Sequence, residues 1–497
     1  MTSRLAAVTN LHGQTSAYTY LDNLGDHRLQ TIHHKYPNGS TLSKFDYTYN
    51  AVGNILTWRQ QSDTTAVVWE YGYDAADQLT AAVKKATDPQ ATVLQRYAYA
   101  YDPAGNRTSE QIDDAVTSST YDRLNHLGSQ QGGGPVVFKG SVNEPATVTV
   151  NSRSATVTPD NRFEGKATLA VGTTTVNITA TDPSGNAATA VYEVDQAASG
   201  KTFSYDANGN LTNDGTRTFE WDAADRLVAV NVGTHRSEFT YDGFDQRVRI
   251  VEKENGTIVS DQPFIWNGNQ IAERRTVTGS TGTTRVYRFG LQDNGAARYL
   301  TQDQVLSIRE TTDDSGTIQA RYDYAPFGAA TKVTGSGSDV LEYTGAPVHE
   351  ASGLFLMKRR AYDPAMARWL SEDPIGLKAG PNLYAYVVND PLRWIDPEGT
   401  RIVMPLPWLP NGNVGDWYNR QDNICSQPMG ALGFNGAPCI KKCCQAHDDC
   451  YAASRCNWTS WLTIAYDSAC TRCNRTAVMC ILNADARPDA CRECEKK

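Results

Sequence analysis

The first 424 residues contain no cysteine, although the whole chain of 497 residues has 11. No run of about 18 apolar residues occurs, which excludes a membrane-spanning helix. The N-terminal residues lack the apolar stretch of a secretory signal peptide, so any export is expected to use another route. The net charge of −9 argues against a general nucleic-acid binder, because phosphate binding needs a basic surface. No nucleic-acid partner is therefore expected.

The cysteines divide the chain into two regions of different chemistry. All of them fall between Cys425 and Cys494. The charges divide near the same place: residues 401–497 hold 11 Lys and Arg against 9 Asp and Glu, whereas residues 1–400 hold 35 against 46. A short, cysteine-dense segment is typical of a small domain held together by disulfides. We therefore expect the tail to act in an oxidising compartment, either the periplasm or the extracellular space.

A short unit recurs before the tail. An aromatic residue ends an alternating stretch and is followed by Asp-x-x-Gly-Asn or a close variant, as in segment 101–107, which reads Tyr-Asp-Pro-Ala-Gly-Asn-Arg. The glycine supplies a positive φ, and the Asp and Asn side chains bond the local backbone, so each unit predicts the turn of a β-hairpin. Neighbouring hairpins would bury each other's aromatic faces. Further copies begin at Tyr49, Tyr73, Tyr205, Trp221 and Tyr241.

These units resemble the tyrosine–aspartate (YD) repeats of Rhs proteins and of Tc-toxin C components, over roughly residues 1–130 and 200–400. In that family the repeats wind into a hollow β-shell that holds a toxic C-terminal cargo. The most specific similarity is the sequence Asp-Pro-x-Gly at 373–376 and again at 396–399, which is similar to the motif that ends the shell in Rhs proteins. The resemblance implies a polymorphic toxin that cuts its own chain just after this motif.

Asp373 and Asp396 are the candidate pair for this self-cleavage. Two carboxylates held close together can share a proton, so that one serves as acid and the other as base. The resemblance places the cut between Thr400 and Arg401, although relatives usually carry a bulky apolar residue where this chain has Thr400. From composition alone, two turns are the better interpretation of the Asp-Pro-x-Gly segments. The family resemblance favours a catalytic pair.

Residues 134–197 interrupt the repeats with short alternating segments rich in Val, Thr and Ala. With no cysteine and no helical period, they predict an inserted immunoglobulin-like β-sandwich without chemistry of its own. Strands are expected at 146–150, 154–157, 166–171, 173–181 and 187–194. Among the histidines before the tail, His33 and His34 are expected at the surface. His235 and His349 are isolated in the sequence and are assigned no role.

The tail has one histidine, in a segment that reads Cys-Cys-Gln-Ala-His-Asp-Asp-Cys-Tyr from Cys443 to Tyr451. On a helix, His447 and Asp448 would project side by side. Segment 470–482 predicts a second helix, with cysteines two turns apart. Two antiparallel helices cross-linked by disulfides would hold a catalytic group rigidly without a large core.

The residues of the tail leave three interpretations open. The first is a structural domain held together by disulfides, in which the histidine has no catalytic role. The second interpretation is a zinc site. Two Cys-x-x-Cys pairs, at 470–473 and 491–494, are separated by 17 residues, as in zinc ribbons. Zinc would leave seven other cysteines unexplained. The third interpretation is a hydrolase built on the His-Asp pair.

The sequence Cys-Cys-x-x-His-Asp-x-Cys at 443–450 resembles the active-site helix of secreted phospholipase A₂, and 473–480 is similar to the second helix of that family. The resemblance implies that His447 is the general base that deprotonates water and that Tyr451 lies beside the site. The family's Asp that orients the histidine is Asn474 here, which predicts a slower enzyme, because Asn stabilises imidazolium charge less well. The resemblance also implies two disulfides, Cys443–Cys480 and Cys450–Cys473.

Ca²⁺ is the cofactor that the resemblance implies, held by the carboxylate of Asp448. The cation would polarise the ester carbonyl and stabilise the oxyanion. Its further oxygen ligands would be the backbone carbonyls of Pro428, Gly430 and Leu432 in a glycine-rich loop, although this loop lacks the family's cysteine. The expected reaction is Ca²⁺-dependent hydrolysis of the sn-2 ester of membrane phospholipids.

The sequence thus predicts a mainly β protein, a YD-repeat shell with an inserted sandwich, plus a small disulfide-rich α-helical C-terminal domain. The expected divisions are 1–133 and 198–400 for the shell, 134–197 for the insert and 401–497 for the toxin domain. Expected partners are a membrane phospholipid substrate, a cognate immunity protein and a secretion-system delivery partner. The alternative is a non-enzymatic surface repeat protein whose cysteine-rich tail binds a partner through disulfides or zinc.

Overall fold

The computed structural model describes residues 5–405, apart from 11, 88–90, 198–199, 269, 280, 288–289 and 336–340. Residues 6–405 belong to one compact unit. The cysteine-rich tail lies outside the described residues, and so do its predicted helices, disulfides and site residues. Within the described ranges no helix is long and apolar enough to cross a membrane. Helical structure there is confined to four short 3-10 turns: η1 (Asn23–Gly25), η2 (Tyr343–Gly345), η3 (Gly376–Ala379) and η4 (Val387–Asn389).

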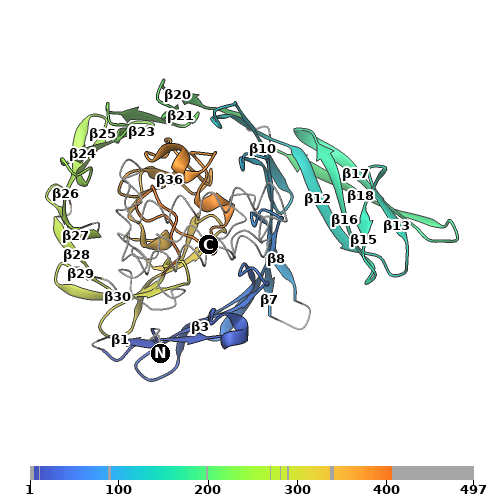
Figure 1. Cartoon of the computed structure of the whole chain (residues 1–497), viewed down its shortest axis with the longest axis horizontal. Coiled ribbons are helices and arrows are strands. Elements are labelled where there is room, and N and C mark those ends of the chain that lie inside the picture. The colour runs from blue at the N-terminus through green and yellow to red at the C-terminus, as the bar shows by residue number, and fades with distance from the viewer. Residues whose placement is uncertain are drawn as a thin grey trace, which may run out of the picture. The chain divides into compact units, whose positions relative to one another are not determined.

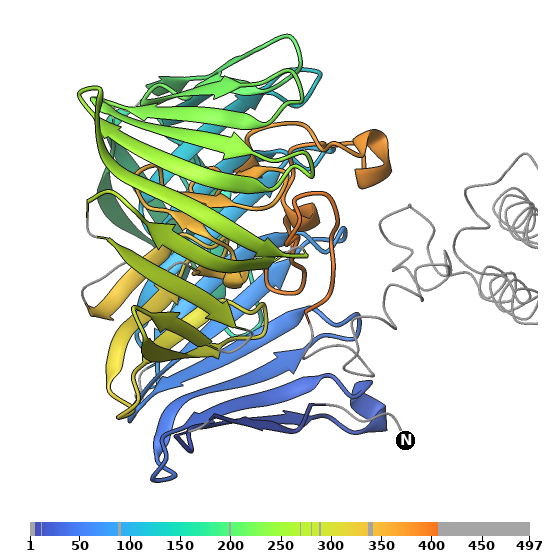
Figure 2. The same ribbon diagram turned by 90° about the vertical axis from the view of Figure 1, so that its left-hand side faces the viewer.

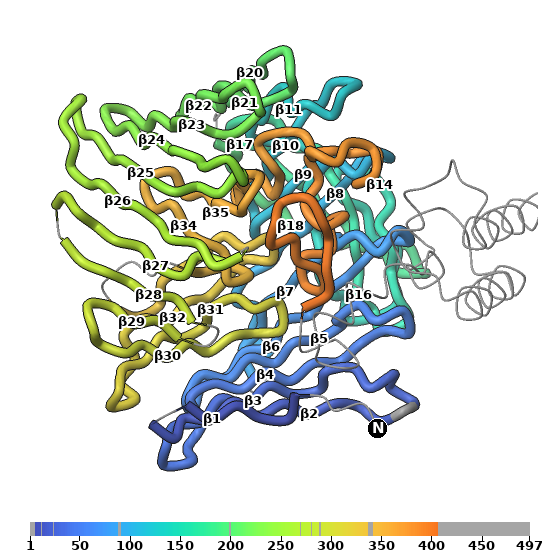
Figure 3. Tube along the Cα trace, turned by 60° about the vertical axis from the view of Figure 1, so that its left-hand side comes forward, coloured from blue at the N-terminus to red at the C-terminus, as the bar shows by residue number. Residues whose placement is uncertain are grey.

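The described chain is mainly β, as the sequence predicted. Its first large sheet, here called the first sheet, pairs twelve strands antiparallel, almost all in chain order. Consecutive strands lie side by side along the trace in Figure 3. The strands are β1 (Ala7–Thr9), β2 (Thr15–Tyr20), β3 (Leu29–Lys35), β4 (Thr41–Tyr49), β5 (Ile55–Ser62), β6 (Thr65–Tyr73), β7 (Leu79–Ala86), β8 (Val93–Tyr101), β9 (Arg107–Ile112), β10 (Ala115–Tyr121), β11 (Leu127–Gly132) and β19 (Gly200–Thr202).

The second sheet continues the same pattern after the insert. Within the described ranges it has fourteen antiparallel strands in chain order, and Figure 2 shows most of them stacked one above another. The strands are β20 (Ser204–Tyr205), β21 (Leu211–Asn213), β22 (Arg217–Trp221), β23 (Leu227–Val232), β24 (His235–Tyr241), β25 (Arg247–Glu254), β26 (Thr257–Asn267), β27 (Gln270–Thr276), β28 (Gly282–Tyr287), β29 (Gly290–Asp293), β30 (Ala296–Gln302), β31 (Ile308–Thr312), β32 (Ile318–Tyr324) and β33 (Ala330–Gly335).

The recurring unit forms the hairpin turns, as predicted. In the turn after β8, one carboxylate oxygen of Asp102 accepts the backbone N–H groups of Ala104 and Asn106, both at 2.9 Å. The other oxygen accepts the Asn106 amide at 2.9 Å. Gly105 has φ +79°, and its N–H bonds the carbonyl of Asp102. The side chains therefore satisfy the turn's own backbone groups, and a glycine supplies the left-handed residue.

The aromatic residue of each unit has a role that the sequence did not reveal. In most units its hydroxyl or indole N–H donates to the carbonyl of the first residue of a strand in the preceding hairpin, which ties the two hairpins together; the Tyr205 hydroxyl instead accepts the N–H of Leu127 at 3.1 Å. Tyr101, for example, donates to Leu79 at 2.7 Å. The same bond joins Tyr49 to Leu29, Tyr73 to Ile55, Tyr121 to Arg107, Trp221 to Leu211, Tyr241 to Leu227, Trp266 to Arg247 and Tyr324 to Ile308.

Replacing Tyr101 with Phe tests this tie. The ring stays, but the Leu79 carbonyl loses its donor, and we expect a loss of about 1 kcal/mol in the free energy of unfolding. A lower urea midpoint would show it. The matched control is Tyr192→Phe on β18 (Ala187–Gln196), where the side chain is 52% exposed and the change is expected to be neutral. An equal shift in both variants would contradict the assigned role of the hydroxyl.

The segment predicted as an inserted sandwich forms two sheets of its own. One orders its strands β12 (Gly134–Ser141), β16 (Arg162–Leu169) and β15 (Thr156–Val157). The other orders them β14 (Arg153–Ser154), β13 (Thr147–Val150), β17 (Gly172–Thr181) and β18. The last two strands fall where the sequence predicted them, whereas β12 was not expected. Buried Val136, Val150, Leu169 and Val176 pack between the strands. The exact boundaries of the four expected domains stay predictions.

The insert lies next to β10 of the first sheet in Figure 1, and two glutamines fasten it there. The Gln111 side-chain amide accepts the N–H of Val137 at 2.8 Å and donates to its carbonyl at 3.3 Å. The Gln196 amide accepts the N–H of Val116 at 2.9 Å and donates to the carbonyl of Asp114 at 2.7 Å. Each side-chain amide thus takes the place of a neighbouring strand's peptide group.

Residues 341–405, here called the inner segment, lie between the two large sheets, which curve around them in Figure 1. This segment contains four short strands: β34 (Val348–His349), β35 (Leu354–Leu356), β36 (Ala361–Asp363) and β37 (Arg368–Trp369). Arg107 of the first sheet donates to the Ala365 carbonyl at 3.0 Å, and Arg217 of the second sheet pairs with Asp363. Its aromatic core, including Tyr362, Trp369 and Tyr386, is almost fully buried. Contacts from both sheets therefore fix the inner segment.

Candidate self-cleavage site

The two Asp-Pro-x-Gly motifs of the inner segment converge on one arginine. The Nη2 atom of Arg360 lies 2.6 Å from Oδ2 of Asp373 and 3.2 Å from Oδ2 of Asp396. All three side chains are at most 5% exposed. Each motif is also a turn: Asp373 accepts the Ile375 N–H at 3.0 Å. The turn interpretation and the paired-carboxylate interpretation therefore describe the same residues.

The second carboxylate is surrounded by backbone N–H groups. Oδ1 of Asp396 accepts the N–H groups of Gly399, Thr400 and Arg401 at 2.9, 3.0 and 2.9 Å. The loop is closed by paired backbone hydrogen bonds between Ile395 and Val403. The Arg401 nitrogen, which belongs to the peptide bond at which cleavage was predicted, therefore bonds the same oxygen of Asp396 as the Thr400 nitrogen does.

Arg360 is positioned by contacts that are independent of the carboxylates. Its Nη1 donates to the Leu383 carbonyl at 3.0 Å, and its Nε donates to the Gly399 carbonyl. Its guanidinium lies 4.2 Å from the centroid of the Trp369 ring. Gly399 has φ +75°, and a Cβ there would lie 3.0 Å from the Arg360 backbone nitrogen. A glycine is needed at this point for the loop to approach the arginine so closely.

Burial changes the proton affinities within the site. It raises the pKa of Asp373 above its usual 3.8, and the contact with Arg360 offsets this only in part. Burial likewise lowers the pKa of Arg360, although both carboxylates act to raise it. The two carboxylates face a single positive charge, so a proton is most easily held on the pair at Asp373. The site therefore combines a protonatable acid with a carboxylate that touches the backbone of the predicted cut.

The structure brings together the three residues that the sequence analysis proposed for self-cleavage. Asp373 and Asp396 share one arginine, and the Thr400 backbone bonds Asp396. Arg360 was not found from the sequence, because it is 13 residues from one acid and 36 from the other. No local signal in the sequence distinguishes it, because Lys358 and Arg359 precede it in the same basic run. The remaining candidates lie outside the described residues: His447, Asp448, Tyr451, Asn474, Pro428, Gly430, Leu432 and the disulfides Cys443–Cys480 and Cys450–Cys473.

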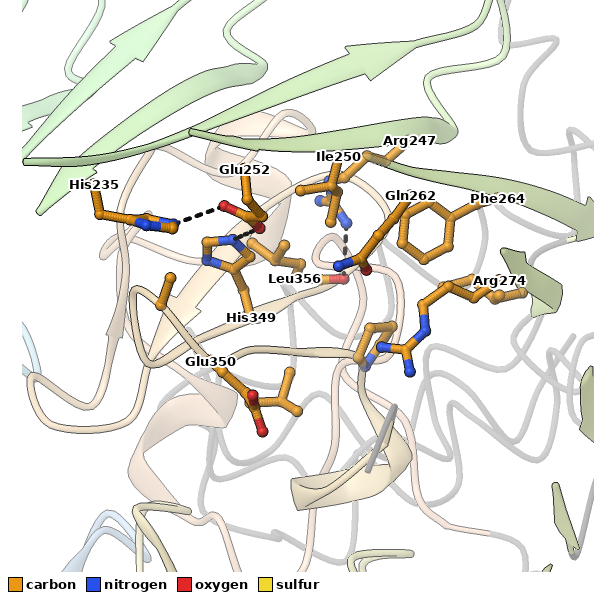
Figure 4. A pocket seen from close by; sticks show the side chains of 14 residues that line it. His235, Arg247, Ile250, Glu252, Gln262, Phe264, Arg274, His349, Glu350 and Leu356 are labelled. Atoms are coloured by element: carbon orange, nitrogen blue, oxygen red, sulfur yellow. Dashed lines mark hydrogen bonds and ion pairs between the residues drawn. The ribbon is translucent and has the colours of Figure 1, made fainter. Parts of the chain in front are cut away.

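The histidines of the shell differ from expectation. His34 was expected at the surface, but it is 1% exposed, and its ring bonds the Ser16 hydroxyl at 2.7 Å and the Gln302 carbonyl at 2.9 Å. The expectation was wrong because a strand far along the chain covers this side chain. His235 and His349, isolated in the sequence, both contact Glu252, at 2.9 and 3.0 Å (Figure 4). Within the described ranges no group of three or more His, Cys, Asp and Glu residues is arranged to hold a metal ion.

The Glu252 cluster predicts a pH dependence of stability. Burial opposes ionisation of Glu252, but hydrogen bonds from His349, Ser237 and His235 hold its pKa at about 2. Partial burial acts to lower the pKa of His235, yet its bonds to Glu252 and Glu254 raise it above 6.5. The Glu252 contribution is therefore complete above its unfolded pKa of 4.5 and disappears as the pH falls toward 2. The His235 contribution is complete below pH 6.5 and disappears as the pH rises through its raised pKa.

Urea unfolding of the wild-type chain and of Glu252→Gln at pH 3, 5.5 and 8.5 tests this expectation. Glu252→Gln keeps the shape of the side chain and removes its charge. The difference in unfolding free energy between the two chains should be largest at pH 5.5 and smaller on both sides. A difference that is the same at all three pH values would show that the ionic contacts add nothing to stability.

Comparison with known proteins agrees with this architecture. Residues 191–391 match the family described as the teneurin YD-shell. The tRNA3(Ser)-specific nuclease WapA of Bacillus spizizenii is 28% identical over 214 residues, which cover 40% of this chain and 9% of WapA. The double-stranded DNA deaminase toxin A of Burkholderia cenocepacia is 28% identical over 238 residues, 40% of this chain and 17% of that protein. Toxin subunit YenC2 of Yersinia entomophaga is 26% identical over 427 residues, 73% of this chain and 43% of YenC2.

A chain in the crystal structure titled TcdB2-TccC3-Cdc42 matches 78% of the present chain, over 22% of its own length, with 19% identity and a TM-score of 0.36. This chain spans less than half the length of each of the three curated relatives.

One set of sequence-based expectations is corrected by these relatives. A membrane phospholipid was expected as the substrate and nucleic acid was excluded, but the relatives include proteins named for action on tRNA and on double-stranded DNA. The charge argument failed because the acidic excess lies in residues 1–400, which hold 46 Asp and Glu against 35 Lys and Arg. Residues 1–400 alone carry −11 (35 − 46), so the negative net charge of the chain comes from them and gives no information about what a C-terminal segment acts on.

Proposed function

We propose that this chain, which carries a YD-repeat shell, is a delivered polymorphic toxin that hydrolyses its own backbone between Thr400 and Arg401 and so frees the segment after it as an enzymatic effector. The observation that carries the proposal is the 2.9 Å contact between Oδ1 of Asp396 and the backbone nitrogen of Arg401. That nitrogen is the atom that must take up a proton when the peptide bond breaks. The toxin names of several relatives support delivery out of the producing cell.

The chemistry uses the two carboxylates in different ways. One carboxylate takes a proton from water, whose oxygen attacks the Thr400 carbonyl carbon. The bond from that carbon to the Arg401 nitrogen then breaks, and a carboxylic acid gives its proton to the departing amine. Asp396 is placed for the second step, because its oxygen already touches the Arg401 nitrogen. Asp373, whose pKa burial raises, is placed to hold the proton that the pair shares before the reaction. The ionised Asp396 then takes the proton from water and passes it to the Arg401 nitrogen as the peptide bond breaks.

Intact mass measurement of the purified full-length chain tests this proposal. We expect two species, one ending at Thr400 and one beginning at Arg401, and expect the second to accumulate with time. A single species of 54.5 kDa after prolonged incubation would overturn the proposal. A cut at any other peptide bond would show that Asp396 does not select the site.

For the freed segment we propose a Ca²⁺-dependent hydrolase, supported by the similarity of residues 443–450 and 473–480 to secreted phospholipase A₂. His447 would activate water, with Tyr451 and Asn474 beside it. Asp448 and the carbonyls of Pro428, Gly430 and Leu432 would hold Ca²⁺. The Cys443–Cys480 and Cys450–Cys473 disulfides would need oxidation after export, which would keep the segment poorly folded in the producing cell.

The assay for this hydrolase includes nucleic acid, because the relatives' names contradict its exclusion. The full-length chain would be incubated with a soluble sn-2 carboxylic ester, with tRNA and with double-stranded DNA, each with Ca²⁺ and with chelator. We expect ester hydrolysis that needs Ca²⁺ and is lost in His447→Gln, whereas the exposed shell variant His27→Gln retains it. Cleavage or deamination of nucleic acid that persists in His447→Gln would replace this proposal with a different chemistry.

A further inference from the structure

A cavity of about 190 Å³ lies between the second sheet and the inner segment. Strands β24 to β27 line one side of it, and residues 347–351 with Leu356 line the other. Figure 4 shows the Glu252 cluster at one end and Arg247, Gln262 and Phe264 at the other. Apolar side chains complete the lining near Arg247, namely Ile250, Phe264, Ile271 and Leu356. The cavity therefore has apolar side chains beside the buried Arg247, and a second, half-buried arginine, Arg274, also lines it.

The Arg247 guanidinium, on the wall of this cavity, makes few hydrogen bonds and no ion pair among the described residues. It is 5% exposed, and within the described ranges no carboxylate oxygen lies within 4.0 Å of it. Nη1 and Nη2 make only long bonds, of 3.4 and 3.3 Å, to the carbonyls of Leu356 and Met357, and Nε has no partner among the described residues. The guanidinium also lies over the Phe239 and Tyr241 rings, at 5.5 and 5.6 Å. This buried guanidinium therefore has N–H donors that are still able to bond a ligand, and no carboxylate balances its charge.

Other buried arginines show what is missing. Arg107, Arg309 and Arg360 each have a carboxylate oxygen within 4.0 Å, and so does the partly buried Arg217. Arg368 has no such ion pair among the described residues, but it makes a 2.6 Å bond to the Asn125 carbonyl and lines neither of the two described cavities. Arg247 alone in this set combines the lack of an ion pair with a place on a cavity wall.

Comparison of two YD repeats shows which group Arg247 lacks. Arg107 and Arg247 are equivalent, since each is the first residue after its hairpin turn and each donates to carbonyls of the inner segment. Three residues beyond Arg107 stands Glu110, whose carboxylate contacts the Arg107 guanidinium at 3.0 Å. Three residues beyond Arg247 stands Ile250, which lines the cavity. One repeat thus provides a carboxylate for its arginine, whereas the other provides an apolar wall and an open space.

We propose that this cavity binds a small monocarboxylate, whose carboxylate pairs with Arg247 and whose short apolar body packs against Ile250, Phe264 and Ile271. The size of the cavity limits the ligand to a few carbon atoms. A second negative charge is disfavoured at the end opposite Arg247, because Glu252 and Glu350 line that end and the Glu252 carboxylate is already engaged by His235 and His349. The site is separate from the Asp373–Asp396 pair and does not depend on self-cleavage.

Calorimetric titration of the full-length chain with 3-methylbutanoate tests the proposal, with 3-methylbutanamide and succinate as comparisons. We expect saturable binding of 3-methylbutanoate, with the uncharged amide and the dicarboxylate at least about tenfold weaker, as befits a charge-assisted bond. Equal binding of acid and amide, tighter binding of succinate, or no saturable binding of the acid would each overturn the proposal.

Two variants locate the site. Ile250→Glu supplies the carboxylate that the equivalent repeat has, so it should abolish binding without lowering the urea midpoint. Arg247→Met should also abolish binding. The matched control is Ile258→Glu on β26, where the side chain is 47% exposed and binding should be unchanged. Binding that survives Ile250→Glu, or an Ile250→Glu chain that fails to fold, would show that a carboxylate does not fit beside Arg247 and would overturn the proposal.

Discussion

The Asp396→Asn chain is expected to remain intact, with self-cleavage slowed by a factor of about 100 to 10,000. Asn has the same shape, and its oxygen can still accept the three N–H groups of residues 399–401, so the loop should keep its conformation. It cannot donate a proton to the Arg401 nitrogen as a carboxylic acid can. The intact fraction after purification, followed over time by mass spectrometry, gives the rate.

Asp363→Asn is the matched control for this variant. Asp363 is also buried and also paired with an arginine, Arg217, but it does not contact residues 396–401 in any described hydrogen bond. Its substitution should leave the rate of self-cleavage unchanged. Asp373→Asn should slow cleavage as Asp396→Asn does, because the shared proton is lost. If the Asp396→Asn chain is cut at the wild-type rate, the catalytic role of this carboxylate is refuted.

The hairpin shell was predictable because its determinants are local. The fullest turns are built by an Asp, a Gly and an Asn within five residues, and the side chains bond the same turn's backbone, as at Asp102 and Asn106. Such a pattern can be recognised without knowing the rest of the fold. The aromatic of each unit was interpreted only as a packing residue. Its bond to the preceding hairpin, as from Tyr101 to Leu79, depends on the register between hairpins, which the local pattern does not contain.

Contacts between distant parts of the chain set the limit of the sequence analysis. His34 lies in an alternating strand and looked exposed, but Gln302, far along the chain, covers it. His235 and His349 looked unrelated, but Glu252 joins them. Nothing in the spacing of these residues encodes the pairing, because the inner segment must first be enclosed by the second sheet. Buried ionic contacts are therefore the part of this molecule that local pattern describes least well.

The candidate self-cleavage site contains residues that a local pattern reveals and one that only distant contacts reveal. Asp373 and Asp396 were identified because the same four-residue motif occurs twice, and the structure places both carboxylates on one guanidinium nitrogen. Arg360 escaped notice because an arginine alone has no motif, and its function comes from the position of two turns in space. The site's electrostatics nevertheless depend on it, since two buried carboxylates without a countercharge would strongly resist ionisation.

Replacing Arg360 with Met should therefore destabilise the shell by about 3–5 kcal/mol, because it leaves two nearly fully buried carboxylates without their cation. Met keeps much of the length and the contact with Trp369, so the loss reports mainly on charge and hydrogen bonds. The double variant Arg360→Met with Asp373→Asn has one carboxylate fewer to neutralise and should recover part of the lost stability. Urea unfolding of both chains measures the difference, with Arg236→Met as the control for loss of an arginine that is only partly buried, at 34% exposure. If Arg360→Met costs no more than Arg236→Met, the arginine does not hold the two carboxylates together, and their convergence must arise from the turns alone.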